Sequence, residues 1–129
     1  MKQVHFQEKY PITVVEVAKS ETSFTTTMQI AEYFKEKIET TDKVVYIATF
    51  DHYEHTSNIG GEIAPEIQSA VNVVFCFGHM LPNPQVLAVR PRSIGIADMG
   101  NQFVVSFMDA PMKPANDAMQ AWALGLRNA

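Results

Sequence analysis

Apolar side chains recur along this chain in two periods, and each period predicts a type of secondary structure. Five short segments rich in apolar and β-branched residues predict strands. They are residues 10–18, 44–50, 71–77, 93–97 and 103–108. Segments 44–50 and 71–77 are apolar on both faces, which is typical of strands that are covered on both sides or central in a sheet. The last two segments are expected to form a hairpin, because Gly100 and Asn101 between them suit a turn.

Apolar residues spaced three and four apart predict two long helices. The first is expected to begin after Ser23, whose hydroxyl suits an N-cap. Its apolar face comprises Phe24, Met28, Ala31, Phe34 and Ile38. The second is expected to begin at Pro114, which suits the first helical position. Its apolar stripe comprises Ala115, Met119, Trp122 and Leu126. Residues 52–61 predict a short helix that stops at Gly60 and Gly61.

The predicted order is strand, helix, strand, short helix, three strands and helix. This order favours the α+β class, with a single sheet and two long helices packed on one face. A length of 129 residues predicts one domain, residues 1–129.

Charge and apolar content narrow the classes of partner. The formal net charge is −4, and Arg90 and Arg92 are the closest approach to a basic cluster. A nucleic-acid partner or an anionic membrane surface is therefore not expected. One cysteine excludes an intrachain disulfide and fits a reducing compartment. No apolar run approaches the roughly 20 residues of a membrane span, and no secretory signal is visible, so we expect a cytoplasmic protein.

The densest group of chemically active side chains is residues 51–55, Asp-His-Tyr-Glu-His, directly after a predicted strand. If this segment opens a helix, His52 and His55 share a face and suit zinc, copper, nickel or iron with a carboxylate as third ligand. Alternatively, Asp51 orients His52 as a general base. In the structural interpretation, Asp51 only caps the short helix, while Glu54 and His55 are solvated.

A second candidate is the loop of residues 78–84, whose two prolines exclude regular structure. His79 and Met80 within it would suit haem or a soft copper ion. The simpler interpretation is that His79 is exposed and that Met80 covers the edge of the core. The loop would approach His52 only if strands 44–50 and 71–77 were parallel neighbours, because antiparallel neighbours end at opposite edges.

Sulfur-containing side chains favour packing over chemistry. Cys76 lies in an apolar strand, where a thiol behaves as a small buried hydrophobe. Met28 and Met119 fall on the core faces of the predicted helices. Four other methionines, in the later strands and loops, are either filler or the lining of an apolar pocket: Met80, Met99, Met108 and Met112.

Several short motifs, in their order, carry a resemblance to a known family. A helix opens at Ser-Phe-Thr-Thr-Thr, residues 23–27, and a strand ends at Asp51-His52. The next strand ends at Phe77-Gly78, which an apparent insertion separates from Asn83-Pro84. The hairpin ends in Ser-Phe-Met-Asp-Ala-Pro, residues 106–111. Over residues 12–126 the chain resembles the bacterial and archaeal family called domain of unknown function 302, as a divergent member.

This resemblance implies a TATA-binding-protein-like fold, in which a curved, mainly antiparallel sheet is backed by two helices, often in a homodimer. It implies no established activity.

The leading functional hypothesis is a homodimeric module that binds a small molecule or a metal centre at the sheet edge. Its candidate ligand-binding residues are Asp51, His52, His55, Gly78, His79, Met80, Asn83 and Asp109. The candidate metal ligands are His52, His55 and His79. The alternatives are an enzyme that uses Asp51 and His52 as an acid–base pair, a haem- or metal-carrying protein, and a purely structural interaction domain.

Overall fold

The computed structural model describes residues 1–78 and 80–129. The strands are β1 (Lys2–Phe6), β2 (Tyr10–Ala18), β3 (Val44–Asp51), β4 (Ser69–Phe77), β5 (Arg92–Asp98) and β6 (Gln102–Met108). The helices are α1 (Thr27–Glu39), α2 (His52–Asn58) and α3 (Lys113–Leu124), with 3₁₀ turns η1 (Lys19–Glu21) and η2 (Pro84–Ala88). In the described part of the chain, no helix is long and apolar enough to cross a membrane.

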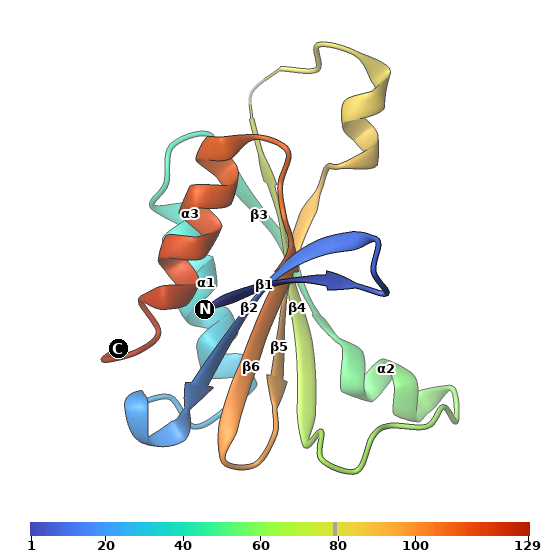
Figure 1. The fold of residues 1–129 in the computed structure, drawn as a ribbon, viewed down its shortest axis with the longest axis vertical. Helices are drawn as coiled ribbons and strands as arrows, with labels where there is room; N and C mark the ends of the chain where they lie inside the picture. The colour runs from blue at the N-terminus through green and yellow to red at the C-terminus, as the bar shows by residue number, and fades with distance from the viewer. Residues whose placement is uncertain (79) are drawn as a thin grey trace.

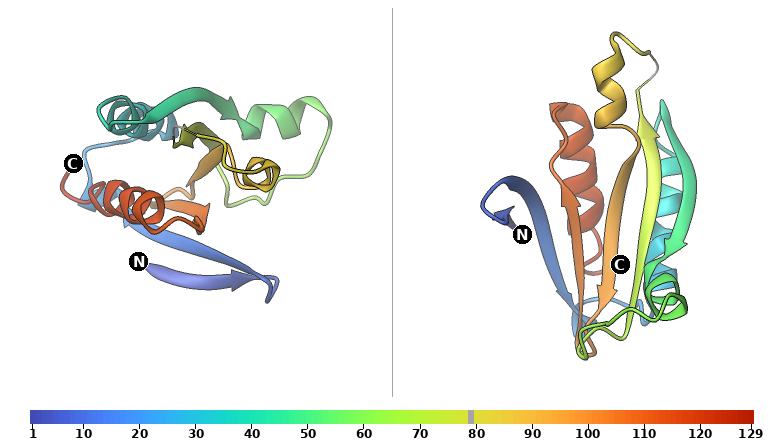
Figure 2. Two further views of the ribbon diagram at one scale, coloured as in Figure 1. Left: turned by 90° about the horizontal axis from the view of Figure 1, so that it is seen from above. Right: turned by 90° about the vertical axis from the view of Figure 1, so that its right-hand side faces the viewer.

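The six strands form one open sheet in the order β1-β2-β6-β5-β4-β3, and every neighbouring pair is antiparallel. Helices α1 and α3 pack side by side on the same face of this sheet (Figures 1 and 2). The predicted class, α+β with two long helices on one face, is therefore confirmed. The predicted hairpin is confirmed as β5 and β6.

Alternating side chains along the strands build the core between sheet and helices. The fully buried set combines one face of four strands with the inner faces of α1 and α3, as period-two and period-3.6 patterns require. Its largest members are Phe34, Phe75, Phe103, Ile30, Ile38, Ile94, Ile96, Met119 and Leu126. The Tyr33 hydroxyl of α1 donates to the Trp122 carbonyl of α3 at 2.8 Å, and burial raises the pKa of this phenol. The neutral phenol therefore joins the two helices.

The other face of the sheet, which we call the uncovered face, has neither long helix on it (Figure 2). Cross-strand pairing assigns side chains of all six strands to this face. The large apolar ones that are exposed are Phe6, Tyr10, Val45, Ile47, Phe50 and Met108. Small side chains lie between them, among them Ala70, Ser93, Gly95, Ala97 and Ser106.

The expected start of the first helix at Ser23 is wrong, because α1 begins three residues later. Thr26 is the N-cap, and its hydroxyl accepts from the Gln29 N–H at 3.1 Å. The Gln29 side chain accepts in return from the Thr26 N–H at 3.3 Å, which completes a capping box. The Ser23 N–H is instead bonded to the Ala129 carbonyl.

The later start also corrects the predicted core face of this helix. Ile30 is fully buried, whereas Met28 is 48% exposed and is not a packing residue. Met119, the other methionine assigned to a core face, is buried as expected.

Two expectations about strands also need correction. The segment Val44–Asp51 is an edge strand, not a central or doubly covered one, and Val45 on its outer side is 63% exposed. Strand β1 was not predicted, because Lys2–Phe6 is short and mostly exposed and gives no apolar run.

We expect Phe34→Ala to lower the free energy of unfolding by about 3–5 kcal/mol, because it removes a fully buried ring from the core. Met28→Ala, on the exposed side of the same helix, should change it by about 0.5 kcal/mol or less. Urea denaturation followed by circular dichroism measures both. A loss at Met28 as large as that at Phe34 would contradict the described face of α1.

Candidate functional site

Asp51 is the N-cap of α2. Its Oδ1 accepts from the backbone N–H of Glu54 at 2.9 Å, which satisfies a donor that the start of a helix leaves free. The side chains of Asp51 and Glu54 are both exposed. The carboxylate at the start of the cluster therefore serves the helix backbone, in agreement with the structural interpretation of this segment.

His52 is held by the neighbouring strand rather than by Asp51. Its Nδ1 lies 3.0 Å from Oδ1 of Asn72 on β4. Because an amide oxygen can only accept, Nδ1 of His52 is the donor in this contact. The ring borders a shallow hollow of about 150 Å³ on the uncovered face, beside Gly95 and Ser106.

His52 and His55 lie on one side of α2, as their spacing predicts. Their ring centroids are 6.0 Å apart, and each lies 5.3 Å from the ring of Phe50. Within residues 1–78 and 80–129, no group of three or more His, Cys, Asp or Glu side chains could hold a metal ion. His79 lies outside the described residues, so the metal set His52, His55 and His79 stays a prediction.

The direction of β3 and β4 separates the candidate residues into two groups. In this antiparallel pair Asp51 is opposite Val71, whereas Val44 is opposite Phe77. Gly78, which directly follows β4, therefore lies at the end of the sheet away from α2. Figure 1 shows that the segments after β3 and β4 leave the sheet at opposite ends. Asp51 and His52 do not share a pocket with Gly78.

Asp109, which follows β6, lies at the Gly78 end of the sheet and has a structural role. Its Oδ1 accepts from the Thr13 hydroxyl at 2.7 Å, and its Oδ2 accepts from the Gln3 amide. Its backbone N–H is bonded to the Pro11 carbonyl at 3.0 Å. This carboxylate therefore connects the end of β6 to β2 and β1.

Asn83 likewise serves the backbone. Its side-chain oxygen accepts from the Val86 N–H at 3.2 Å and so caps the 3₁₀ turn η2. Of the candidate residues in this loop that the structure describes, Gly78 and Met80 are the ones that lie beside a cavity.

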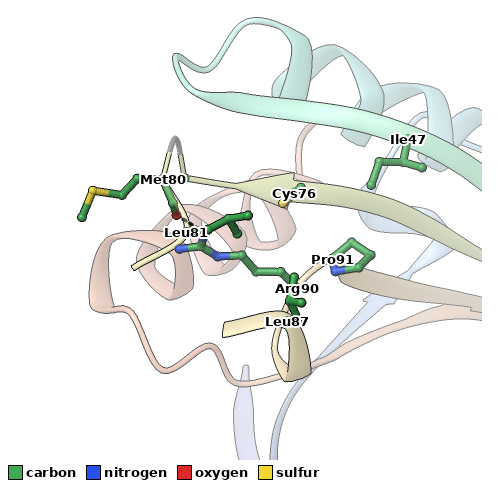
Figure 3. Close-up of a pocket in the computed structure, with 8 residues that line it drawn as sticks. Ile47, Cys76, Met80, Leu81, Leu87, Arg90 and Pro91 are labelled. Atoms are coloured by element: carbon green, nitrogen blue, oxygen red, sulfur yellow. Dashed lines mark hydrogen bonds between the residues drawn. The ribbon is translucent and has the colours of Figure 1, made fainter. Parts of the chain in front are cut away.

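A cavity that we call the Arg90 groove lies where the uncovered face meets η2 (Figure 3). Its volume is about 550 Å³, and its lining is Ile47, Cys76, Gly78, Met80, Leu81, Leu87, Arg90 and Pro91. Ile47 and Cys76 come from β3 and β4, and Leu87 comes from η2. The Met80 side chain points away from the other labelled residues (Figure 3), so its carbonyl is the part that faces Arg90.

Gly78 makes room for the arginine of this groove. A Cβ on Gly78 would lie 2.9 Å from Nη2 of Arg90, and its φ of +91° is one that other residues rarely adopt. Nη1 of Arg90 donates to the Met80 carbonyl at 2.7 Å, and Nη2 lies 3.8 Å from Sδ of Met112. The guanidinium is thus held close to the backbone of Gly78 and Met80.

Sequence reasoning missed most of this lining. Ile47, Leu87, Arg90 and Pro91 were not among the candidates, and Cys76 was expected to be a buried hydrophobe although it is half-buried and faces the groove. The one available signal was Arg90, noted only as part of a weak basic cluster.

The sheet, the two covering helices and the groove define an α+β protein with one uncovered sheet face. The chain belongs to the family of unknown function DUF6858, whose family model matches residues 1–128. Neither the comparison with curated proteins nor that with solved structures gave a match. The expectation of an uncharacterised family is confirmed, while the more specific resemblance to domain of unknown function 302 stays a prediction.

We expect Asp51→Ala to lower the free energy of unfolding by about 1 kcal/mol, because it removes the N-cap of α2. Asp51→Asn should keep most of the free energy of unfolding that Asp51→Ala loses, since asparagine is as good an N-cap as aspartate. Urea denaturation of both variants measures the difference. Equal losses in the two variants would show that the charge of Asp51, and not its capping oxygen, is what matters.

Proposed function

We propose that this protein is a homodimeric module that binds a small, largely apolar molecule in the Arg90 groove. The observation that carries the proposal is the groove itself. Its volume of about 550 Å³ falls within the roughly 300–1,000 Å³ of small-molecule sites. Its lining is mainly apolar with one cationic group, the combination that gives affinity from burial and orientation from charge.

Exposed apolar side chains supply the driving force. Leu87 is 62% exposed and Ile47 is 52% exposed, so both have substantial apolar surface in water. A ligand that covers them removes this surface from water, at about 25 cal/mol per Å². The two residues come from η2 and β3, so one ligand would contact two separate elements.

The second copy would pack on the uncovered face. Cross-strand pairing gives this face one acid and one base in the strands, Glu16 and Lys2, and the two pair with each other at 2.8 Å. A neutral, apolar face is compatible with an identical face across a twofold axis, where like charges would repel.

The distribution of side-chain size also supports a second copy of this chain as the occupant of the uncovered face. Large apolar residues lie on two margins of the uncovered face, Val45 and Phe50 on β3 and Phe6 and Tyr10 on the β1–β2 hairpin. Gly95 and the other small residues lie between them. A large margin of one copy can therefore fit into the small centre of the other. The resemblance to domain of unknown function 302 implies a homodimer as well.

The alternative enzyme, with Asp51 and His52 as an acid–base pair, has less support. Asp51 accepts from the Glu54 N–H, and Nδ1 of His52 is bonded to Asn72. Asp51 and His52 are thus each hydrogen-bonded to another residue, whereas an acid–base pair requires a bond between the two.

The groove predicts that a neutral apolar dye such as Nile red binds with an increase in its fluorescence. Leu87→Glu should weaken this binding about tenfold or more, because it places a charge in the apolar lining. Ile59→Glu is the matched control, since Ile59 is similarly exposed but lies at the end of α2, away from the groove. Equal weakening in both variants would place the dye elsewhere.

The proposed packing of two copies through the uncovered face predicts that light scattering gives the mass of a dimer. Val45→Glu should convert it to a monomer, because it places like charges on the face that two copies would share. Met28→Glu, which introduces the same charge at an exposed apolar residue of the helix layer, should leave the dimer intact. A monomeric mass for the unmodified protein would contradict the proposed assembly.

A further inference from the structure

Two cavities meet at Arg90. On the far side of the end of β4 from the Arg90 groove lies a smaller cavity of about 90 Å³, which we call the inner pocket. Its lining is Phe77, Val86, Val89, Arg90, Arg92, Ala110, Pro111, Met112 and Ala115. Two arginine side chains therefore border a mainly apolar hollow, and one of them, Arg90, also borders the groove.

Neither arginine forms an ion pair with a carboxylate in the described part of the chain. Within the described residues, the ion pairs are Lys2–Glu16, Lys19–Asp98, Lys113–Asp117 and Arg127–Glu21. Arg90 and Arg92 are in none of these pairs, although the chain has 14 acidic residues and 10 basic ones. A protein with surplus carboxylates thus leaves two arginines beside its cavities outside the ion pairs of its described residues.

The hydrogen bonds of the two guanidiniums go to neutral groups. Arg90 donates to the Met80 carbonyl, and Arg92 donates to the carbonyls of Val89 and Met108. Nε of Arg92 is buried and has no hydrogen-bond partner in the described structure. Burial lowers the pKa of Arg92, and the nearby Asp109 carboxylate opposes this shift. The two oxygens of Asp109 accept from Thr13 and Gln3.

We propose that the ligand is an amphipathic carboxylate, with its acid group on Arg90 and its apolar chain along the Arg90 groove. This inference rests on the proposed function and names the chemical class of its ligand. Guanidinium presents N–H donors in a planar fork that matches the two oxygens of a carboxylate. Arg92 adds a second positive charge behind this position.

The apolar part of such a ligand has a matching surface. Leu81, Leu87 and Ile47 line the groove. Figure 3 shows Leu81 and Leu87 beside the extended arginine side chain, and Ile47 across from it on β3. A straight alkyl chain can cover these three side chains while its acid stays at the guanidinium. Each further methylene that is buried should then tighten binding about fourfold.

The test compares decanoate with decan-1-ol, which has the same chain length and no charge, by isothermal titration calorimetry. Decanoate should bind about tenfold tighter or more, because only its head group can pair with Arg90. Octanoate should bind about 16-fold more weakly than decanoate, since it has two fewer methylenes.

Variants of the arginine locate the acid group. Arg90→Met should remove the preference for decanoate over decan-1-ol, whereas Arg90→Lys should retain part of it, because lysine keeps the charge without the fork. Lys37→Met is the matched control: Lys37 is exposed on α1 and lines neither cavity, so the preference should be unchanged. Circular dichroism verifies that each variant is folded.

A second readout reports on the inner side of this site. Trp122, the single tryptophan, stacks on Phe77 with ring centroids 5.8 Å apart, and Phe77 lines the inner pocket. A carboxylate bound between the two cavities should therefore change the fluorescence of Trp122.

The outcomes separate the two proposals. If decan-1-ol binds as tightly as decanoate, the acid assignment is overturned and the apolar groove remains. If Arg90→Met keeps the preference for the acid, Arg90 is not the binding group. If neither compound nor the neutral dye binds, the proposed function fails together with this inference.

Discussion

Backbone hydrogen bonding between β3 and β4 determines which side chains of this protein can act together. The two strands run antiparallel from Val44 opposite Phe77 to Asp51 opposite Val71. This direction places the helix cap and His52 at one end of the sheet and Gly78 at the other. The polar cluster of residues 51–55 and the loop after β4 are therefore separate regions. The Arg90 groove lies at the Gly78 end.

The alternation of side chains along the strands has a second consequence. One face is buried in the core beneath α1 and α3, and the other is apolar but has neither long helix on it. Arg90 stands at the border of this face with its guanidinium against Gly78. Burial on one face, exposure on the other and a cation at the margin are the three features on which the proposed binding function rests.

Local patterns were enough for the fold class and most elements. The stripe of Ala115, Met119, Trp122 and Leu126 is buried as its spacing predicts, because helical periodicity follows directly from sequence. The N-cap was misplaced because Ser23 and Thr26 are both acceptable caps, and only the reciprocal bond with Gln29 decides between them. In Val44–Asp51 an apolar outer face was taken as a sign of coverage, although pattern alone cannot say what covers it.

The candidate site depended on long-range information. Nothing local to residues 44–50 and 71–77 encodes whether the strands are parallel, so the distance between His52 and Gly78 was open. Leu87 and Arg90 gave no motif, because apolar groove linings have no fixed spacing in sequence. Asp51 and Asp109 were chosen for their chemistry, and both proved to satisfy backbone or neighbouring side-chain donors.

The register shift in β3 between Tyr46 and Ala48 affects how readily another chain could extend this edge of the sheet. An edge strand with exposed apolar residues is a template on which another chain can add as a further strand, the first step toward fibrils. A bulge interrupts the row of backbone donors and acceptors and increases the local twist, so a straight incoming strand cannot pair along its whole length. The irregularity in β3 thus discourages edge-to-edge growth of the sheet while its apolar side chains stay available on the face.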